Sequence, residues 1–437
     1  MADRGAVGRI GRMALEGLTA GGPGWLANRR TEAWEQYERL PMPTTRSEEW
    51  RYTDVSRLLA LDDLTIAAPV EGPLPAPLRE AMDQDRESSG RVTEVDGVVR
   101  TVELSPGLVE QGVVLRSLAE AAADGDEWVE SYLATEAVPA TAGKFEALNA
   151  ALWGDGVVLY VPKGVRLEQP IRLSRWLSEP GTAVFSRILV IAEPESQVSF
   201  VDEILSPDLD RQSLVHTVVE VFARQAAQVQ YVSLQRMGAR GFYMASQRTL
   251  AERDSTLDTL NVGLGASVGR VDLNARLLGP GANSDMLGLY FGDGDQHFDF
   301  NTSQDHVAPH AHSDLLYKGA LDGSSKGVFR GIIRVHKGAQ GTDAYQTNRN
   351  LLLSEGAIAD SLPNLEIGAD DVRCSHGATV GQLDAEALFY LMSRGLRREQ
   401  AERLVVLGFL GEVLSRLPLG GVVEKVTKVI ENKLGYA

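Results

Sequence analysis

The sequence predicts a mainly β protein whose centre is a solenoid of stacked β-coils, with helical segments at both ends. Between residues 156 and 381, short apolar runs alternate with small or polar turns, and six segments there resemble one another. Each of these segments begins with a small residue followed by a polar one. They start at Ser196, Ala227, Ser255, Ala282, Ala311 and Ala339, which are 31, 28, 27, 29 and 28 residues apart.

A repeat of this kind favours a solenoid because one coil exposes an apolar strand face that only its neighbours can cover. A small residue at the same point of every coil permits a tight corner. The period is too long for a hexapeptide β-helix and shorter than a propeller blade. A β-helix or a related stacked β structure therefore fits best, and an ordinary β-sandwich with fortuitous spacing is the alternative.

The first part of the chain, residues 1–155, is expected to form a mixed, mainly helical domain. Apolar residues have helical spacing in four stretches, which are Ala6 to Leu18, Trp25 to Leu40, Leu115 to Leu133 and Phe145 to Leu152. Pro41 and Pro43 break the pattern after the second stretch. The strand-like run Val157 to Val161 marks the change to the β region, which is expected to span residues 156–381.

The last part, residues 382–437, is expected to form a helical domain. Asp384 is a suitable N-cap for a helix over Ala385 to Arg394, and Gly395 ends that helix. A second helix follows and stops at Pro418 and the glycines after it. The apolar stripe of a last helix consists of Val422, Val426, Val429 and Ile430.

Composition excludes several classes of function. The 43 basic and 60 acidic residues give a net charge of −17, which disfavours non-specific nucleic-acid binding and acidic lipid surfaces. Met1 to Ala20 has no apolar segment of the kind found in secretory signals, and the apolar run Leu404 to Leu410 is too short to cross a bilayer. A cytoplasmic protein without membrane or nucleic-acid partners is therefore expected.

The single cysteine, Cys374, excludes an internal disulfide framework and a zinc site made of several thiolates. It also means that this chain alone cannot supply the four thiolates that usually hold an iron–sulfur cluster.

Two groups of residues are candidate metal ligands. In Cys374-Ser375-His376, a strand would place Cys374 and His376 on one face, where a thiolate and an imidazole can bind a borderline metal. Two ligands leave the site incomplete, and the alternative is a buried structural cysteine. The second group is His306, His310 and His312, for which a polar turn of the solenoid is the favoured interpretation.

Four motifs resemble the SufB/SufD family, whose members are core components of the machinery that builds iron–sulfur clusters. They are Asn348 to Ser354, Pro363 to Ile367, Cys374 to Gly381 and Phe389 to Gly395, and Glu49 to Thr53 is similar to the family's N-terminal motif. Within the family, the chain resembles the SufD branch more than the SufB branch. Ser375 and Gly377 stand where SufB members carry acidic residues, and Asn348-Arg349-Asn350 stands where they carry a cysteine.

The resemblance implies a right-handed parallel β-helix flanked by N-terminal and C-terminal helical domains. It further implies a non-catalytic scaffold subunit of a SufBCD complex. This subunit pairs with a SufB-like scaffold through the β-helices, docks a SufC-like ABC-type ATPase through its C-terminal helices, and helps iron enter a nascent cluster.

His376 matches the family's functional histidine, and Cys374 the neighbouring cysteine. Iron or a nascent cluster would be held transiently in the complex and not stably by this chain alone. Residues proposed for part of the ATPase-docking helix are Arg403, Leu404, Val405, Phe409 and Val413, with packing against the β-helix as the alternative. The isolated chain could pair with itself, because β-helix edges invite strand pairing. A SufB-type primary scaffold and a carbohydrate-active solenoid enzyme are the alternative functions.

Overall fold

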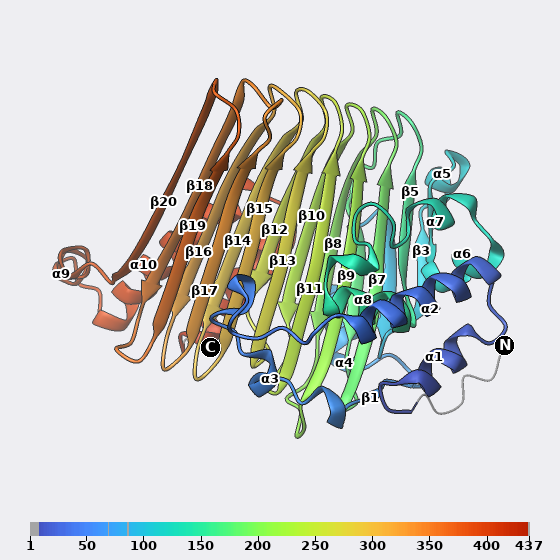
Figure 1. The fold of residues 1–437 in the computed structure, drawn as a ribbon. Coiled ribbons are helices and arrows are strands. Elements are labelled where there is room, and N and C mark those ends of the chain that lie inside the picture. The colour runs from blue at the N-terminus through green and yellow to red at the C-terminus, as the bar shows by residue number, and fades with distance from the viewer. Residues whose placement is uncertain (1–7, 69, 85–86, 436–437) are drawn as a thin grey trace.

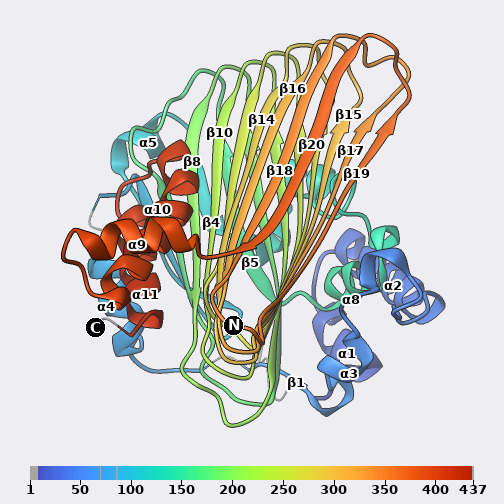
Figure 2. The same cartoon turned by 90° about the vertical axis from the view of Figure 1, so that its left-hand side faces the viewer.

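A parallel β-solenoid of eight coils forms the body of the protein (Figure 1). The computed structural model describes residues 8–68, 70–84 and 87–435. Each coil contributes one strand to each of two sheets, so the expected stacked β architecture is confirmed. The helical segments lie on the outer faces of the two sheets (Figure 2).

Sheet A contains the first strand of every coil. Its parallel strands are β5 (Asp155–Val161), β7 (Thr182–Ala192), β9 (Ser213–Ala223), β11 (Gly241–Ala251), β13 (Val268–Leu277), β15 (His297–His306), β17 (Lys326–Val335) and β19 (Ile358–Ile367). The antiparallel β4 (Val114–Ser117) extends it beyond β5, and the short β1 (Thr65–Ile66) pairs with β7.

Sheet B contains the second strand of every coil. Its parallel strands are β6 (Ile171–Trp176), β8 (Gln197–Leu205), β10 (Gln228–Arg236), β12 (Thr256–Gly263), β14 (Asn283–Gly292), β16 (His312–Leu321), β18 (Thr342–Leu352) and β20 (Val372–Gln382). The hairpin of β2 (Gly90–Val95) and β3 (Val98–Leu104) completes the sheet beyond β6.

The repeat seen in the sequence corresponds to the corner before each strand of sheet B. Five of the six expected start residues are the buried residues directly before β8, β10, β12, β14 and β16. The sixth segment was expected to start at Ala339, which is three residues too early. The ladder pairs His312 with Asp343 and not with Gln340. The corner before β18 is longer than the corners before the other five strands of the repeat, so spacing alone gave the wrong register there.

The N-terminal region combines helices with strands that continue both sheets of the solenoid. Its helices are α1 (Arg12–Thr19), α2 (Gly24–Arg39), α3 (Val55–Leu58), α4 (Ala76–Asp83), α5 (Pro106–Glu110), α6 (Leu118–Asp124), α7 (Glu127–Tyr132) and α8 (Lys144–Leu152), with 3-10 turns at Glu48–Trp50, Leu61–Asp63 and Ala140–Ala142. The expected second and fourth helices are confirmed by α2 and α8. The start of the first expected helix, residues 6 and 7, lies outside the described residues.

The expected helix over Leu115 to Leu133 is wrong, because β4 occupies its beginning and two short helices follow. The Ser117 side chain accepts a hydrogen bond from the N–H of Glu120 and so caps α6. Gly125, with φ of 80°, ends that helix in the left-handed conformation that glycine adopts readily.

Residues 41–58 cross the outer face of sheet A as a strap that contains the Glu49-Trp50-Arg51-Tyr52-Thr53 motif. The Trp50 ring packs on the guanidinium of Arg270, 3.8 Å from the ring centroid. The buried Thr53 hydroxyl lies 2.8 Å from His297 Nε2 and donates to Asp299 Oδ2 at 2.5 Å. This motif therefore attaches the strap to β13 and β15.

The C-terminal helices α9 (Ala385–Ser393), α10 (Arg398–Arg416) and α11 (Val422–Lys433) follow the last coil. α10 packs on β14 and β16, on the outer face of sheet B, whereas α9 lies farther out (Figure 2). The expected N-cap is confirmed, since Asp384 Oδ1 accepts the N–H of Glu386 at 2.9 Å. The expected stripe of the last helix is confirmed too, with Val422, Val426 and Ile430 buried. None of the helices in the described ranges is both long and apolar enough to span a membrane.

Candidate functional site

The Cys374-Ser375-His376 segment lies on β20, the last strand of the solenoid. β20 pairs with β18, in a register that places Cys374 beside Ala344 and His376 beside Gln346. Because side chains alternate along a strand, Cys374 and His376 share the face that is directed toward the interior of the coil. No further coil within the described ranges covers the coil of β19 and β20, so the His376 ring is exposed.

The two candidate ligands differ in their surroundings. The Cys374 side chain is half-buried against an apolar cluster that includes Ile333 and Ala344. Burial raises the pKa of the Cys374 thiol, and the nearby Asp343 carboxylate raises it further. The thiolate is the metal-binding form of cysteine, so the raised pKa makes Cys374 the weaker candidate. The exposed imidazole of His376 is the stronger one.

A complete metal site is not present in the part of the chain that the structure describes, because nowhere in it do three or more His, Cys, Asp or Glu side chains come together as one ligand set. Nitrogen and sulfur donors suit iron and other borderline metals. Cys374 and His376 are thus two donors of the right chemistry on an open edge. The remaining ligands would have to come from another molecule.

A layer of buried polar side chains lies behind this edge, and the motif analysis did not find it. Gln304 Nε2 donates to Ser313 Oγ at 2.7 Å, and His306 Nε2 lies 2.8 Å from the same oxygen. Gln346 is fully buried, and neither atom of its amide has a hydrogen-bond partner among the described residues. In the sequence, this layer is indicated only by polar residues at inward-facing positions of the strands.

The three clustered histidines do not converge on a common point. His306 is buried in the interior, where loss of solvent lowers its pKa to about 4. His310 is exposed in a turn with φ of 57°, and His312 is exposed with its Nδ1 4.0 Å from Asp343 Oδ2. This arrangement agrees with the favoured interpretation, a polar turn of the solenoid.

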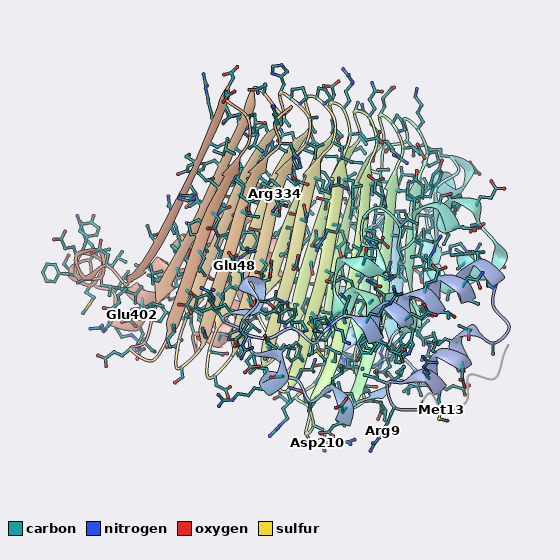
Figure 3. All side chains as sticks on the ribbon, in the orientation of Figure 1. Arg9, Met13, Glu48, Asp210, Arg334 and Glu402 are labelled. Carbon is teal, nitrogen blue, oxygen red and sulfur yellow. The ribbon has the colours of Figure 1, made fainter. Side chains whose placement is uncertain are left out.

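The last coil also leaves apolar side chains uncovered on both sheets. The exposed large apolar residues there are Ile358, Leu365, Ile367 and Val380, and Tyr345 of β18, on the preceding coil, is exposed as well. On the outer face of sheet A, Arg334 of β17 and the strap residue Glu48 lie near this end of the solenoid (Figure 3). The end of the β-helix thus presents two strand edges with apolar side chains.

The expected docking residues on α10 fall into different environments. Leu404 is 50% exposed, whereas Val405 and Phe409 are half-buried. Val413 is fully buried between α10 and sheet B, so it has the alternative role of internal packing. Arg403 forms an ion pair with Glu431 of α11.

Exposed aromatic residues on α9 were missed by the sequence analysis. The Phe389 side chain is 74% exposed, and Tyr390 and Met392 are also exposed. Beside them, a groove of about 440 Å³ runs between α9, α10 and the end of β18, and Glu402 marks its α10 side (Figure 3). Its apolar lining includes Leu388, Phe389 and Met392.

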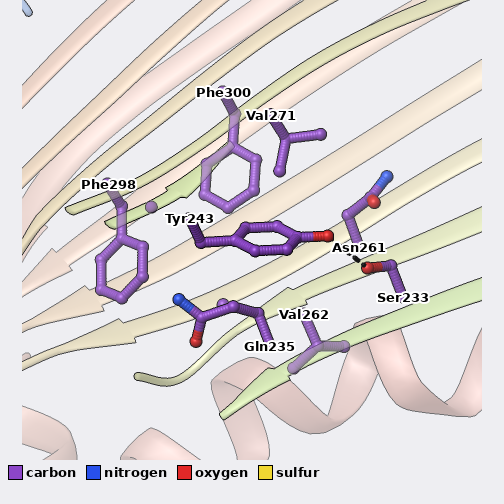
Figure 4. A pocket seen from close by; sticks show the side chains of 10 residues that line it. Ser233, Gln235, Tyr243, Asn261, Val262, Val271, Phe298 and Phe300 are labelled. Atoms are coloured by element: carbon purple, nitrogen blue, oxygen red, sulfur yellow. Dashed lines mark hydrogen bonds between the residues drawn. The ribbon is translucent and has the colours of Figure 1, made fainter. Parts of the chain in front are cut away.

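The interior of the solenoid contains a small cavity of about 10 Å³ (Figure 4). Tyr243 projects into it and its hydroxyl lies 3.4 Å from Ser233 Oγ, with Asn261, Phe298 and Phe300 around it. The volume suits one water molecule. No carboxylate lines this cavity, so it lacks the acidic groups that a carbohydrate-active enzyme would need.

Fold and site together define a parallel β-solenoid whose last coil is open and carries two candidate metal ligands, Cys374 and His376. Family comparisons identify the group of proteins to which it belongs. The core domain of the SufBD family of SUF-system iron–sulfur cluster assembly proteins matches residues 175–409, and the SufBD N-terminal region matches residues 15–173. The chain belongs to the SufBD family and is therefore an iron–sulfur cluster assembly protein.

Individual relatives agree with this assignment. The chain is 32% identical to the iron–sulfur cluster assembly protein SufD of Bacillus subtilis, over 94% of each chain. It is 27% identical to SufBD family proteins of Staphylococcus saprophyticus and of Staphylococcus epidermidis, over 92% of this chain and 88% of theirs. The resemblance to the SufD branch is thus supported by the similarity to a SufD.

Proposed function

We propose that this chain is a SufD-like, non-catalytic scaffold subunit that helps iron enter a nascent iron–sulfur cluster. It would do so in a complex with a SufB-like scaffold and a SufC-like ATPase. The observation that carries this proposal is the position of His376, a free imidazole on the open last coil, where one ligand set can be shared between two chains.

Pairing with the second scaffold would use the free edges of β19 and β20. Ile358 and Gly368 donate their N–H groups to sheet A carbonyls of Ser325 and Val335. In a parallel ladder, alternate residues of a strand bond to opposite neighbours. The even-numbered residues of β19 bond to the preceding coil, so its odd-numbered residues direct their N–H and C=O groups to the open side. Unpaired edges of this kind bind another strand. Pro363 occupies one open position and has no N–H, so an added strand would bond on either side of it.

The iron is cargo in this proposal and not a resident cofactor. His376 would supply one nitrogen ligand, and Cys374 a second, weaker one after loss of its proton. The SufB-like partner would supply the remaining ligands, including the thiolates that this chain lacks. Release of the iron to the partner is favoured, because the two ligands of this chain hold a metal less firmly than a complete set of ligands does.

Docking of the ATPase would use α9 and the exposed side of α10. Phe389, Tyr390, Met392 and Leu404 are exposed large apolar side chains there. Aromatic residues of this kind contribute most of the binding energy in many protein interfaces. The partly covered Arg403 already pairs with Glu431, so it contributes at most to the rim. Movement of the ATPase subunits could then be passed through α10 to sheet B, on which α10 packs.

The test is co-expression with a SufB-like scaffold and a SufC-like ATPase, followed by measurement of subunit ratio and bound iron. The His376→Ala variant should form the complex at the wild-type ratio and retain at least about ten-fold less iron. His310→Ala removes another exposed histidine, from a turn, and serves as the control. Wild-type iron content in His376→Ala would refute the ligand role. Failure of the wild-type chain to join the complex would refute the scaffold assignment.

A further inference from the structure

We propose that Gln346 is a positioning residue for His376, whose ring it holds through a hydrogen bond while the other ring nitrogen binds iron. This inference rests on the proposed function for the role of the metal. The proposed hydrogen bond between Gln346 and His376 is argued only from the structure of the last two coils.

The two residues are neighbours in the ladder of sheet B. Gln346 of β18 pairs with His376 of β20, and the side chains of both are directed to the interior side of the sheet. Neighbouring strands lie about 4.8 Å apart, so a side chain of one residue reaches that of the other. In the described conformation, the His376 ring is exposed and both amide atoms of Gln346 are unpaired.

Two other neighbours of Gln346 cannot satisfy its amide. On the preceding coil its ladder partner is Leu315, which has no polar atom. Across the interior, Gly331 of β17 has no side chain, and a Cβ built there would lie 2.4 Å from Gln346 Nε2 and 2.6 Å from its Oε1. The glycine therefore leaves the space that the amide fills. Among these three neighbours, only His376 can offer a hydrogen bond.

A buried amide without a partner costs free energy that a new hydrogen bond would recover. The exposed His376 ring can turn about its side-chain torsions toward Gln346, so that a ring N–H donates to the amide oxygen. Metal-binding histidines commonly donate their second N–H to such an acceptor, which fixes the tautomer and the direction of the ring. Gln346 would thus select which nitrogen of His376 is presented to iron.

The test uses the full chain with 15N-labelled histidine rings, alone and in the complex with the SufB-like scaffold. The His376 signals are identified by their loss in His376→Ala. Three variants are compared with the wild type. Gln346→Leu removes the acceptor, Gln346→Glu retains one, and Gln247→Leu makes the same change at another buried, inward-facing glutamine with an unpaired Nε2, on the distant strand β11.

In the wild type we expect one dominant His376 tautomer, and in Gln346→Leu a mixture of the two. Affinity of the complex for Fe(II) should fall about 10- to 100-fold in Gln346→Leu. Gln346→Glu should restore the single tautomer, and Gln247→Leu should leave both readouts unchanged. Wild-type ring shifts in Gln346→Leu would overturn the positioning role, whatever the iron affinity. Altered ring shifts with unchanged iron affinity would support the hydrogen bond and refute its role in iron binding, while the iron content of His376→Ala tests the ligand role of His376 separately.

Discussion

Arg187 and Glu220 form a fully buried ion pair between sheet A and the N-terminal helices, with Arg187 Nη1 2.8 Å from Glu220 Oε2. Arg187 also donates to Asn149 Oδ1 of α8 at 2.9 Å. Glu220 accepts the N–H groups of Ala134 and Val138. One ion pair therefore joins β7, β9, α8 and the segment before it.

Removal of one partner of this pair should destabilise the chain strongly. Glu220→Gln would leave the Arg187 charge buried without its counter-ion, and breaking such pairs costs about 3–5 kcal/mol. Thermal or denaturant unfolding monitored by circular dichroism measures the effect. Glu195→Gln breaks the exposed pair with Lys163 and should change stability by less than about 1 kcal/mol. Equal effects of the two substitutions would show that the buried pair has no special role.

Glu94 should make stability depend on pH. Burial raises the pKa of Glu94 to about 7, although the Arg175 charge opposes the shift. The folded state therefore binds the proton more tightly than the unfolded state does. This contribution to stability is complete below the unfolded pKa of about 4.5 and is lost as pH rises through 7.

Glu94→Gln imitates the protonated form at every pH. We expect it to be more stable than the wild type at pH 8, by up to about 3 kcal/mol, and nearly equal to it at pH 4. Urea unfolding at the two pH values provides the comparison. A variant less stable than the wild type at pH 8 would mean that the ionised carboxylate is satisfied by Arg175.

Thr53 should hold the strap of residues 41–58 on sheet A. Thr53→Val keeps the shape of the side chain but leaves His297 and Asp299 without its hydroxyl, which should cost about 1–3 kcal/mol. Limited proteolysis should then cleave the strap faster while the solenoid stays intact. Thr31→Val, on the exposed side of α2, is the matched control. Unchanged cleavage within the strap would assign its attachment to Trp50 instead.

Phe389 should contribute to docking of the ATPase. Phe389→Asp places a charge on an exposed position, so folding stability should change by less than about 0.5 kcal/mol, while co-purification of the ATPase should be lost. Met13→Asp makes a similar change at an 85% exposed apolar residue on α1, far from α9 (Figure 3). Retention of the ATPase by Phe389→Asp would exclude α9 from the docking surface.

The helix cap and the apolar stripe at the C-terminal end were predicted correctly, whereas the helix expected over Leu115 to Leu133 and the features that depend on distant partners were not. The Asp384 cap and the stripe on α11 follow from residues within one or two helical turns, and both are present. Val413 and Phe409 lie on the same helix, yet only the position of α10 on sheet B separates the buried residue from the half-buried one. Helical periodicity identifies an apolar face but not what covers it.

The sequence alone established the stacked coils, the helical ends and Cys374-Ser375-His376 as the metal candidate, because repeats, caps and short motifs are written in consecutive residues. Tertiary structure alone decided that, among the described residues, no strand lies beyond β20 and the Gln346 amide beside His376 has no partner, and that the corner before β18 shifts the register to Asp343. The reason is physical: the environment of a side chain in a solenoid is set by the coils above and below it, which lie about 30 residues away along the chain.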